Sequence, residues 1–329
     1  MKALVTGGGG FLGGSIVRLL VERGDGVISF SRGRYPELEK LGVIHESGDL
    51  VNPGDIRRAV RNCDTVFHVA AKAGSWGFYE DFYCANVTGT ENVIDACREA
   101  GVRRLVYTSS PSVVFNNSDM EGVNESVPYA IHDRVAAGYP ATKAIAEKIV
   151  LAANDDTLAT VALRPHLIFG PGDNHLVPQI VDRAKKGRLK MVGSGKNKID
   201  IIYVDNAAKA HILAADRLEP RSKIAGKAYF ISNDDPRSIE ELFNRIMDIY
   251  GLPKVKQKVP VALAYFGGWM FEKVFALLRL RGEPWVTRFI AKELSTSHWF
   301  DISAARRDFG YHPEISIEEG FNRMRESFG

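Results

Sequence analysis

"KALVTGGGGFLGGSIVRLLVERG", residues 2–24, carries the strongest indication of the fold in this sequence. It starts as an apolar run of strand length, passes through four consecutive glycines, and continues with helical periodicity to its last glycine. Positions 7, 10 and 13 fit G-x-x-G-x-x-G, and positions 8, 10 and 13 equally fit G-x-G-x-x-G. With either spacing, the backbone can turn tightly and bring a pyrophosphate to the positive end of the helix. We therefore predict a dinucleotide-binding turn, with candidate residues Gly7, Gly10, Phe11, Leu12 and Gly13.

The next 140 or so residues repeat the same alternation of strand and helix. Apolar strand-like runs occupy residues 26–32, 64–71, 103–110 and 159–165, and helical patterns occupy residues 55–63, 86–101 and 138–150. Near-continuous apolar strands between helices indicate a parallel sheet that is covered on both faces. The predicted fold is therefore α/β, a Rossmann-type doubly wound parallel sheet.

The rhythm of strands and helices loosens after about residue 170. Residues 169–178 read as a loop, residues 199–218 as a strand and helix that rejoin the core, and residues 259–294 are unusually aromatic and apolar. We predict a dinucleotide-binding core over residues 1–169, rejoined by about 199–230. Residues 170–198 and 231–329 would form a smaller, interleaved C-terminal substrate-binding lobe.

Composition excludes several classes of protein. The net charge is +3 and there is no basic run, so there is no bulk electrostatic case for nucleic acid. The first residues lack the pattern of a signal peptide, and no apolar run reaches the length of a membrane span. The three cysteines, Cys63, Cys84 and Cys97, have no metal or redox spacing, and the histidines are scattered. We expect a cytoplasmic protein with no metal site.

The end of the second predicted strand bears on the choice of dinucleotide. NAD enzymes usually place an acid there, about 20 residues after the glycines, to bind the ribose 2′-hydroxyl. This chain has Ser31 at that point, followed by Arg32 and Arg34. A hydroxyl and guanidinium groups suit a 2′-phosphate, so NADP(H) is preferred over NAD(H). The alternative is that both arginines are only solvated surface charges. Asp49 and Leu50, in "SGDL", are weaker candidates for contact with adenine.

The stretch "GYPATKAIAEKIV", residues 138–150, carries the chemical signal. Tyr139 and Lys143 are four residues apart and share a helix face. A free phenol has a pKa near ~10, and a nearby ammonium lowers it. Ser109 and Ser110 follow a core strand, at the carboxyl edge where α/β proteins bind ligands. Together these residues indicate a proton donor, its tuning charge and a holder for a substrate oxygen, although a tyrosine–lysine pair alone is common by chance.

With these motifs, the chain resembles the extended short-chain dehydrogenases/reductases over essentially its whole length. The resemblance rests on "TGGGGFLG", "GDL", "NVTGTENV", "YPATK" and "LRPHLIFGPGD". The segments "TSSPSVVF" and "RPHLIFGPGD" are similar to the branch that contains 3β-hydroxysteroid and sterol dehydrogenases. Further segments, including "AAKAGSWG" and "LLRLRGEP", resemble the bacterial reductases of 2-alkyl-3-oxoalkanoic acids in long-chain olefin biosynthesis.

The resemblance implies roles for individual residues. Tyr139 would be the general acid toward a ketone oxygen, and Lys143 would also hold the nicotinamide ribose. Ser110 aligns best with the active-site serine, and Ser109 is the weaker choice. The remaining implied cofactor contacts are the backbone around Pro165 and His166, and Ala70 and Ala71. Asn86 would have a structural role by tying core strands together, and Lys72 and Trp76 would anchor a loop near the substrate.

The implied activity is the NADPH-dependent reduction of the 3-keto group of a long-chain 2-alkyl-3-oxoalkanoic acid to the 3-hydroxy acid. One alternative is a 3β-hydroxysteroid or sterol dehydrogenase. Another is a non-catalytic NADP-binding sensor or scaffold, which the intact tyrosine, lysine and serine disfavour. A sugar-nucleotide dehydratase is disfavoured because residues 109–112 contain no acidic pair.

Residues 259–281 leave three interpretations open. Trp269, Phe271 and Phe275 could form a lid over the acyl chains of a hydrophobic substrate. The same segment could instead pack as an interface, or lie on a membrane surface with Arg279 and Arg281 near lipid headgroups. The resemblance further implies a homodimer and a complex with other enzymes of the olefin pathway.

Overall fold

The computed structural model of the protein describes residues 1–133, 137–280 and 282–328. Its centre is a seven-stranded sheet in the order β12-β7-β5-β4-β1-β2-β3, in which every pair of neighbours is parallel. The strands are β1 (Lys2–Thr6), β2 (Gly26–Ser31), β3 (Ile44–Ser47), β4 (Thr65–His68), β5 (Arg104–Thr108), β7 (Ala159–Pro165) and β12 (Lys227–Ile231). The predicted doubly wound α/β fold is confirmed.

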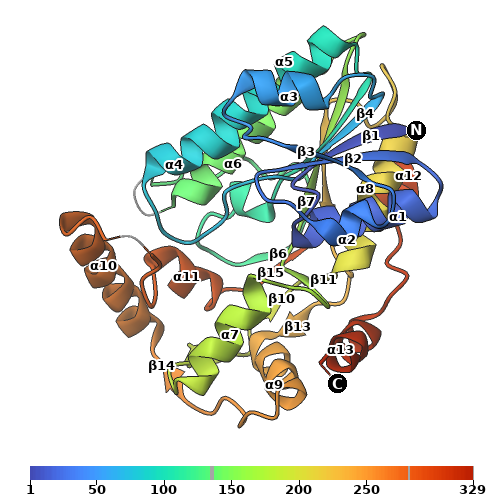
Figure 1. Ribbon diagram of the computed structural model, residues 1–329. Coiled ribbons are helices and arrows are strands. Elements are labelled where there is room, and N and C mark those ends of the chain that lie inside the picture. Colours follow the sequence, from blue (N-terminus) through green and yellow to red (C-terminus); the bar gives the residue numbers. More distant parts are fainter. Residues whose placement is uncertain (134–136, 281, 329) are drawn as a thin grey trace.

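Two layers of helices cover the sheet (Figure 1). One face carries α1 (Phe11–Glu22), α8 (Val204–Arg217) and α12 (Ser303–Phe309), whose apolar residues share one core cluster. The other face carries α3 (Pro53–Ala59), α5 (Gly89–Ala100) and α6 (Gly138–Ala152), which share a second cluster. α12 belongs to the segment predicted as the substrate lobe, yet Phe309 is buried in the first core cluster. The short elements α2 (Pro36–Glu39), α4 (Tyr79–Tyr83), η1 (Cys84–Thr88) and η2 (Pro111–Val113) lie in the connections.

Beyond the carboxyl edge of the sheet lies a second group of elements, which has a larger core cluster and a small separate one formed by Val192, Ala264 and Ala291. The helices of this group are α7 (Leu176–Lys185), α9 (Ile239–Ile249), α10 (Val261–Leu277), α11 (Arg288–Glu293) and α13 (Ile317–Glu326). A four-stranded sheet contains β13 (Arg237–Ser238), β10 (Lys198–Ile199), β15 (His298–Phe300) and β6 (Met120–Val123). Two short pairs join β8 (Ile168–Phe169) to β11 (Ile202–Tyr203) and β9 (Met191–Val192) to β14 (Lys258–Val259).

Three predicted boundaries were wrong. The strand runs predicted to reach residues 71 and 110 leave the sheet at His68 and Thr108, so the residues after them are loops at its carboxyl edge. The loop predicted over residues 169–178 ends earlier, because α7 begins at Leu176. The carboxylate of Asp173 accepts the backbone N–H groups of His175, Leu176 and Val177 and so stabilises the start of this helix.

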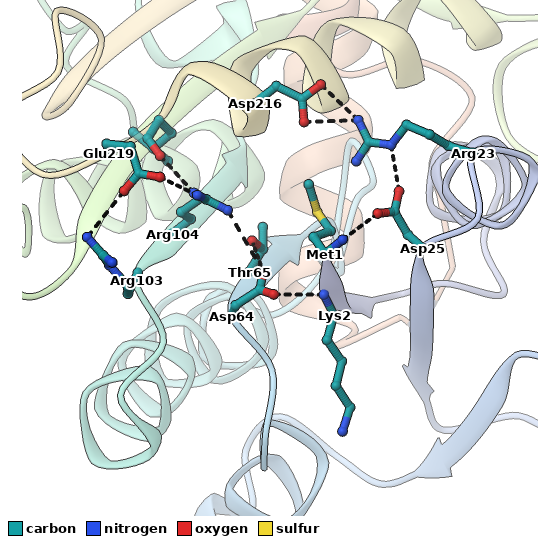
Figure 2. A network of polar contacts seen from close by, with 11 residues as sticks. Met1, Lys2, Arg23, Asp25, Asp64, Thr65, Arg103, Arg104, Asp216 and Glu219 are labelled. Atoms are coloured by element: carbon teal, nitrogen blue, oxygen red, sulfur yellow. Dashed lines mark hydrogen bonds and ion pairs between the residues drawn. The ribbon is translucent and has the colours of Figure 1, made fainter.

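The amino edge of the sheet is closed by a polar network (Figure 2). The N-terminal ammonium lies 2.6 Å from Asp25, which also pairs with Arg23, and Arg23 reaches Asp216 on α8. At the start of β5, Arg104 pairs with Glu219 and donates to the carbonyl of Leu218. These contacts tie the strand starts to the end of α8 and leave the carboxyl edge as the open one. Within the residues described, no helix is both long and apolar enough to cross a membrane.

Candidate active site

A cavity of about 1690 Å³ runs along the carboxyl edge of the sheet and continues between α7, α9, α10 and α11. Loops that follow β1, β2, β4, β5 and β7 form its wall on the sheet side. All the predicted site residues except one line it: Gly7, Gly10, Phe11, Leu12, Gly13, Ser31, Arg32, Asp49, Leu50, Ala70, Ala71, Ser110, Tyr139, Lys143, Pro165 and His166. The structure therefore brings residues from separate stretches of sequence into one space.

The glycine turn has the geometry of a cradle for an anionic group. Gly7 adopts φ 69°, a conformation that favours glycine, and a Cβ on Gly13 would lie 2.1 Å from the carbonyl oxygen of Gly7. No side chain caps the first turn of α1, which begins directly at the cavity. Of the two spacings that the sequence allowed, the one that starts at Gly7 lines the cavity, whereas Gly8 packs against Ser29. These features fit a pyrophosphate at the helix end.

Of the candidate residues at and after the end of β2, some line the cavity and one does not. Ser31 and Arg32 line the cavity, and the Ser31 hydroxyl donates to the carbonyl of Gly33 at 2.9 Å. The guanidinium of Arg34 instead pairs with Glu39, with Nε–Oε1 and Nη2–Oε2 distances of 2.7 and 2.9 Å. Arg34 is the one predicted site residue that is not brought to the cavity wall, because a carboxylate five residues later takes its charge.

Tyr139, at the start of α6, lines the cavity together with Ser110. The Ser110 oxygen accepts the backbone N–H of Ser112 at 3.2 Å, which fixes the hydroxyl at the start of η2. Burial raises the pKa of Tyr139 to about 12, and the negative charge of Glu293 acts in the same direction, whereas the nearby Ser110 hydroxyl lowers the pKa. The phenol is therefore protonated at neutral pH.

Lys143 is buried one helical turn further along α6. Its ammonium donates to the carbonyl of Thr108 at 2.6 Å and lies 4.1 Å from the centroid of the Tyr107 ring. Burial lowers the pKa of Lys143 to about 7, while the charge of Glu147 raises it. The expected lowering of the Tyr139 pKa by Lys143 is not met, because burial of the phenol dominates.

An ion pair that sequence reasoning missed supports Lys143. Glu147 follows Lys143 by four residues on α6 and is fully buried. Arg164 on β7 donates to it, with an Nε–Oε2 distance of 3.0 Å, and Tyr129 donates its phenol at 2.7 Å. The i, i+4 spacing of the lysine and glutamate was the signal that could have indicated a charge relationship along this helix.

Two buried histidines join the loop after β7 to the segment after α11. His166 Nε2 lies 3.2 Å from His298 Nδ1, and His298 Nε2 donates to the backbone carbonyl of Glu293 at 2.8 Å. Burial lowers the pKa of both histidines, so the rings are neutral and His166 donates to His298. The sequence carried no signal for this contact, because the partners come from distant segments.

The loop after β4 is fixed by hydrogen bonds with Asn86. The Asn86 amide accepts the N–H of Lys72 at 2.7 Å, donates to the carbonyl of Lys72 at 3.0 Å, and donates to Thr142 on α6. It therefore ties the loop to α6 rather than joining core strands. The ring of Trp76 meets Phe275 of α10 edge-on, with centroids 6.1 Å apart. The ammonium of Lys72 forms an ion pair with the carboxylate of Asp81, with an Nζ–Oδ2 distance of 3.7 Å.

The helix α10 is apolar on two sides. Leu263, Ala264, Gly267 and Phe271 line the cavity. The large exposed apolar residues of this helix and of the turn after it are Leu263, Tyr265, Phe266, Trp269, Met270, Val274, Leu277, Leu278 and Leu280. Figure 1 shows α10 at the outer rim, beside α11. Arg279 is described, whereas Arg281, the second arginine of the proposed membrane-surface segment, lies outside the described residues.

Comparisons with known proteins agree with this geometry. The 3-beta hydroxysteroid dehydrogenase/isomerase family matches residues 4–261. The 2-alkyl-3-oxoalkanoate reductase of Stenotrophomonas maltophilia (strain K279a) is 53% identical over 329 residues, which are 99% of each chain. The mouse (Mus musculus) sterol-4-alpha-carboxylate 3-dehydrogenase, decarboxylating, is 36% identical over 99% of this chain and 91% of its own length.

Among solved structures, the UDP-glucose 4-epimerase of Thermus thermophilus, in complex with NAD, has a TM-score of 0.76 and 25% identity. It covers 100% of this chain and 99% of its own, so the fold is shared from end to end. The sequence relatives are named as reductases and dehydrogenases, which sets the class of reaction. The match to the family spans most of the chain, and the sheet and cavity agree with it. The chain belongs to the 3-beta hydroxysteroid dehydrogenase/isomerase family and is an oxidoreductase of the extended short-chain dehydrogenase/reductase type.

Proposed function

We propose that the protein reduces the 3-keto group of a long-chain 2-alkyl-3-oxoalkanoic acid to a hydroxyl, with NADPH as the reductant. One observation carries the proposal: Tyr139 and Ser110 lie together in a single cavity that has the glycine turn at one end and apolar helices at the other. A relative that is 53% identical over 99% of each chain is named 2-alkyl-3-oxoalkanoate reductase. When bound, the nicotinamide dinucleotide supplies the hydride.

Tyr139 is suited to act as the general acid. Because its pKa is about 12, the phenol holds its proton at neutral pH and can deliver it to the ketone oxygen. Ser110, fixed by the N–H of Ser112, donates to the same oxygen as negative charge develops on it. Lys143, which donates to the carbonyl of Thr108, would hold a hydroxyl of the cofactor's ribose and place its charge near the phenol.

The proposed preference for NADP(H) rests on Ser31 and Arg32. Both line the cavity at the end of β2, where a 2′-phosphate would lie, and neither is an acid that would repel it. Arg34 would join them only after it leaves Glu39. The turn near Asp49 and Leu50 also lines the cavity and would border the adenine.

The substrate half of the cavity favours acyl chains. Apolar side chains from α9, α10 and α11 line it, including Phe243, Leu263, Phe271, Phe289 and Ile290. Such walls make no hydrogen-bond demands on a hydrocarbon chain. The inner face of α10 therefore supports the proposal that it is a lid. Its exposed outer face leaves the interface and the membrane-surface contact as predictions.

A sterol carboxylate is the second candidate substrate, because the mouse relative is named for one. In both candidate substrates, the carbon that bears the oxygen is bonded directly to the carbon that bears the carboxylate. The homodimer and a complex with other enzymes of olefin biosynthesis stay predictions from resemblance, and the cytoplasmic location stays a prediction from the sequence composition. They change none of the roles proposed for the residues in the cavity.

The test runs the reaction in the oxidative direction, since 3-oxo acids lose carbon dioxide readily. Purified protein receives NADP⁺ and a long-chain 2-alkyl-3-hydroxy acid, and NADPH formation is followed by absorbance. We expect turnover that falls about 10²- to 10⁴-fold in Tyr139→Phe, the usual contribution of a positioned acid or base. Tyr83→Phe is the matched control, because that tyrosine lies outside the cavity wall.

A 3β-hydroxysteroid and a sterol carboxylate with NAD⁺ are assayed in parallel. Turnover of a steroid without turnover of the branched acid would move the protein to the sterol substrates. Full activity in Tyr139→Phe would overturn the assignment of the acid. Tight NADPH binding without turnover of any of these compounds would instead support a non-catalytic role.

A further inference from the structure

The covalent structure of the proposed substrate sets a requirement on the site. In a 2-alkyl-3-oxo acid, the carboxylate and the ketone carbon are attached to the same atom, C2. When the ketone oxygen meets Tyr139 and Ser110, the carboxylate must lie within a few ångströms of them. Its charge then leaves water, which is costly unless a partner meets it. The cavity wall beside Tyr139 must therefore contain a group that accommodates a carboxylate.

Six cations of the described part of the chain line the cavity, and two of them, Arg183 on α7 and Lys190 just before β9, lie away from the sheet. Lys143 donates to the carbonyl of Thr108 from within the buried part of α6. Lys72 lies 3.7 Å from the carboxylate of Asp81. Arg188 lies over the ring of Trp285, 4.5 Å from its centroid, and Arg32 stands at the cofactor end, after β2. The wall beside the phenol offers a different kind of group.

Glu293 is that group. It is the last residue of α11, it lines the cavity, and it is close enough to Tyr139 that its charge raises the pKa of the phenol. Among the described residues, its carboxyl group has no hydrogen bond or ion pair. Its backbone carbonyl, in contrast, is fixed by the N–H of His298, which is held in turn by His166. The side chain is thus presented to the cavity from an anchored backbone and without a protein partner.

The protonation state of Glu293 suits an anionic ligand. Burial raises the pKa of its carboxyl group to about 7, well above the ordinary value, so a large share of the group carries a proton at neutral pH. A nearby carboxylate would raise this pKa further, because two negative charges at close range are unfavourable. A protonated carboxyl group has one O–H to donate, and a carboxylate is a strong acceptor.

We propose that Glu293, in its protonated form, donates a hydrogen bond to the carboxylate of the substrate and thereby selects 3-oxo acids over plain ketones. This inference rests on the proposed function, because it assumes that the ketone oxygen lies at Tyr139. Glu293 is then a specificity residue, distinct from the acid Tyr139 and the oxygen holder Ser110. This role of Glu293 also predicts that the acyl chains extend from C2 and C3 away from α11 and along the apolar wall.

The experiment compares two substrates in the oxidative assay with NADP⁺. One is the long-chain 2-alkyl-3-hydroxy acid, and the other is the secondary alcohol of the same chain without the carboxyl group. In Glu293→Leu, kcat/KM for the acid should fall about 10- to 100-fold, the usual effect of losing a hydrogen bond to a charged group. For the alcohol it should change less than about threefold, within the context dependence of such effects. Glu293→Gln should keep most of the selectivity, since its amide still donates.

Arg188→Leu is made as the rival variant, because it removes a cation from another part of the cavity wall. It should leave the ratio of kcat/KM for acid and alcohol unchanged. An equal loss for both substrates in Glu293→Leu would overturn the proposal, as would a loss of selectivity in Arg188→Leu with none in Glu293→Leu.

A binding measurement separates this proposal from the proposed function. The NADPH-loaded protein is titrated by calorimetry with a long-chain 2-alkylalkanoic acid and with the corresponding primary alcohol, neither of which can react. The wild-type protein should prefer the acid, and Glu293→Leu should lose that preference. If the wild-type protein failed to oxidise the hydroxy acid, the proposed function would fall, while this comparison would still decide the role of Glu293.

Discussion

The two arginines that follow β2, Arg32 and Arg34, have different surroundings although they are close in sequence. Arg32 lines the cavity, whereas Arg34 is held by Glu39 and is 74% exposed. We expect Arg32→Ala to weaken NADPH binding about 10- to 100-fold, because a charge-assisted hydrogen bond to the 2′-phosphate is lost. NADH lacks that phosphate, so its affinity should change little. Fluorescence titration with each dinucleotide measures both values.

Arg34→Ala is the matched variant at the same scale. Its guanidinium is already paired in the structure, so its removal should affect NADPH binding less than the removal of Arg32. Equal losses of NADPH and NADH affinity in Arg32→Ala would show that the residue acts on the fold of the turn and not on the phosphate. A larger effect of Arg34 would mean that its pair with Glu39 opens when the dinucleotide binds.

At the scale of elements, α1 depends on two adjacent glycines that meet different surroundings. A Cβ on Gly13 would lie 2.1 Å from the carbonyl oxygen of Gly7, whereas a Cβ on Gly14 would meet only ordinary contacts, the nearest at 3.5 Å. We expect Gly13→Ala to push α1 away from the turn. It should destabilise the protein by about 1–3 kcal/mol, as overpacking does, and weaken NADPH binding more than about tenfold.

Gly14→Ala is the control on the same helix. It should leave NADPH binding nearly unchanged and stabilise the protein by about 0.5–1 kcal/mol, because alanine is favoured over glycine inside a helix. Urea unfolding and dinucleotide titration measure both variants. Similar behaviour of the two would mean that the close approach of α1 to the turn is not what organises the cradle.

At the scale of the whole molecule, Asp200 links the strands of the smaller sheet. Its backbone N–H donates to the carbonyl of His298 at 3.1 Å, and its carboxylate accepts the N–H of Phe300 at 2.9 Å. Burial raises the pKa of Asp200 from 3.8 to about 7. Between these pH values the folded state retains a proton that the unfolded state has lost, so the contribution of Asp200 to stability falls as the pH rises toward 7.

We therefore expect Asp200→Asn to gain stability relative to the wild type when the pH is raised from 5 to 8, by roughly 1–3 kcal/mol. Urea unfolding at the two pH values provides the measurement. Asp155→Asn is the control: hydrogen bonds with Thr157 and Leu158 hold the pKa of Asp155 well below its ordinary value, so its effect should be the same at both pH values. If the difference in the free energy of unfolding between Asp200→Asn and the wild type were the same at both pH values, the raised pKa of the buried Asp200 carboxyl group would be contradicted.

Local pattern was enough to predict the sheet and much of the cavity wall. The glycine turn, the i, i+4 spacing of Tyr139 and Lys143, and the serines after β5 are short-range features whose geometry follows from the backbone. Parallel strands end at one edge, so residues just after them meet without further information. Arg34 was the exception, because Glu39 competes for its charge.

Short-range patterns in the sequence thus specified the doubly wound sheet and the carboxyl edge at which Ser110, Tyr139 and Lys143 line the cavity. Which distant side chains join them depends on tertiary packing. Glu293 comes to Tyr139, and His298 to His166, because the chain returns through α11 and β15 to the carboxyl edge of the sheet. No periodicity or spacing encodes such a return. It follows from how the apolar faces of the last elements pack, and that packing also sets the pKa of the groups it buries.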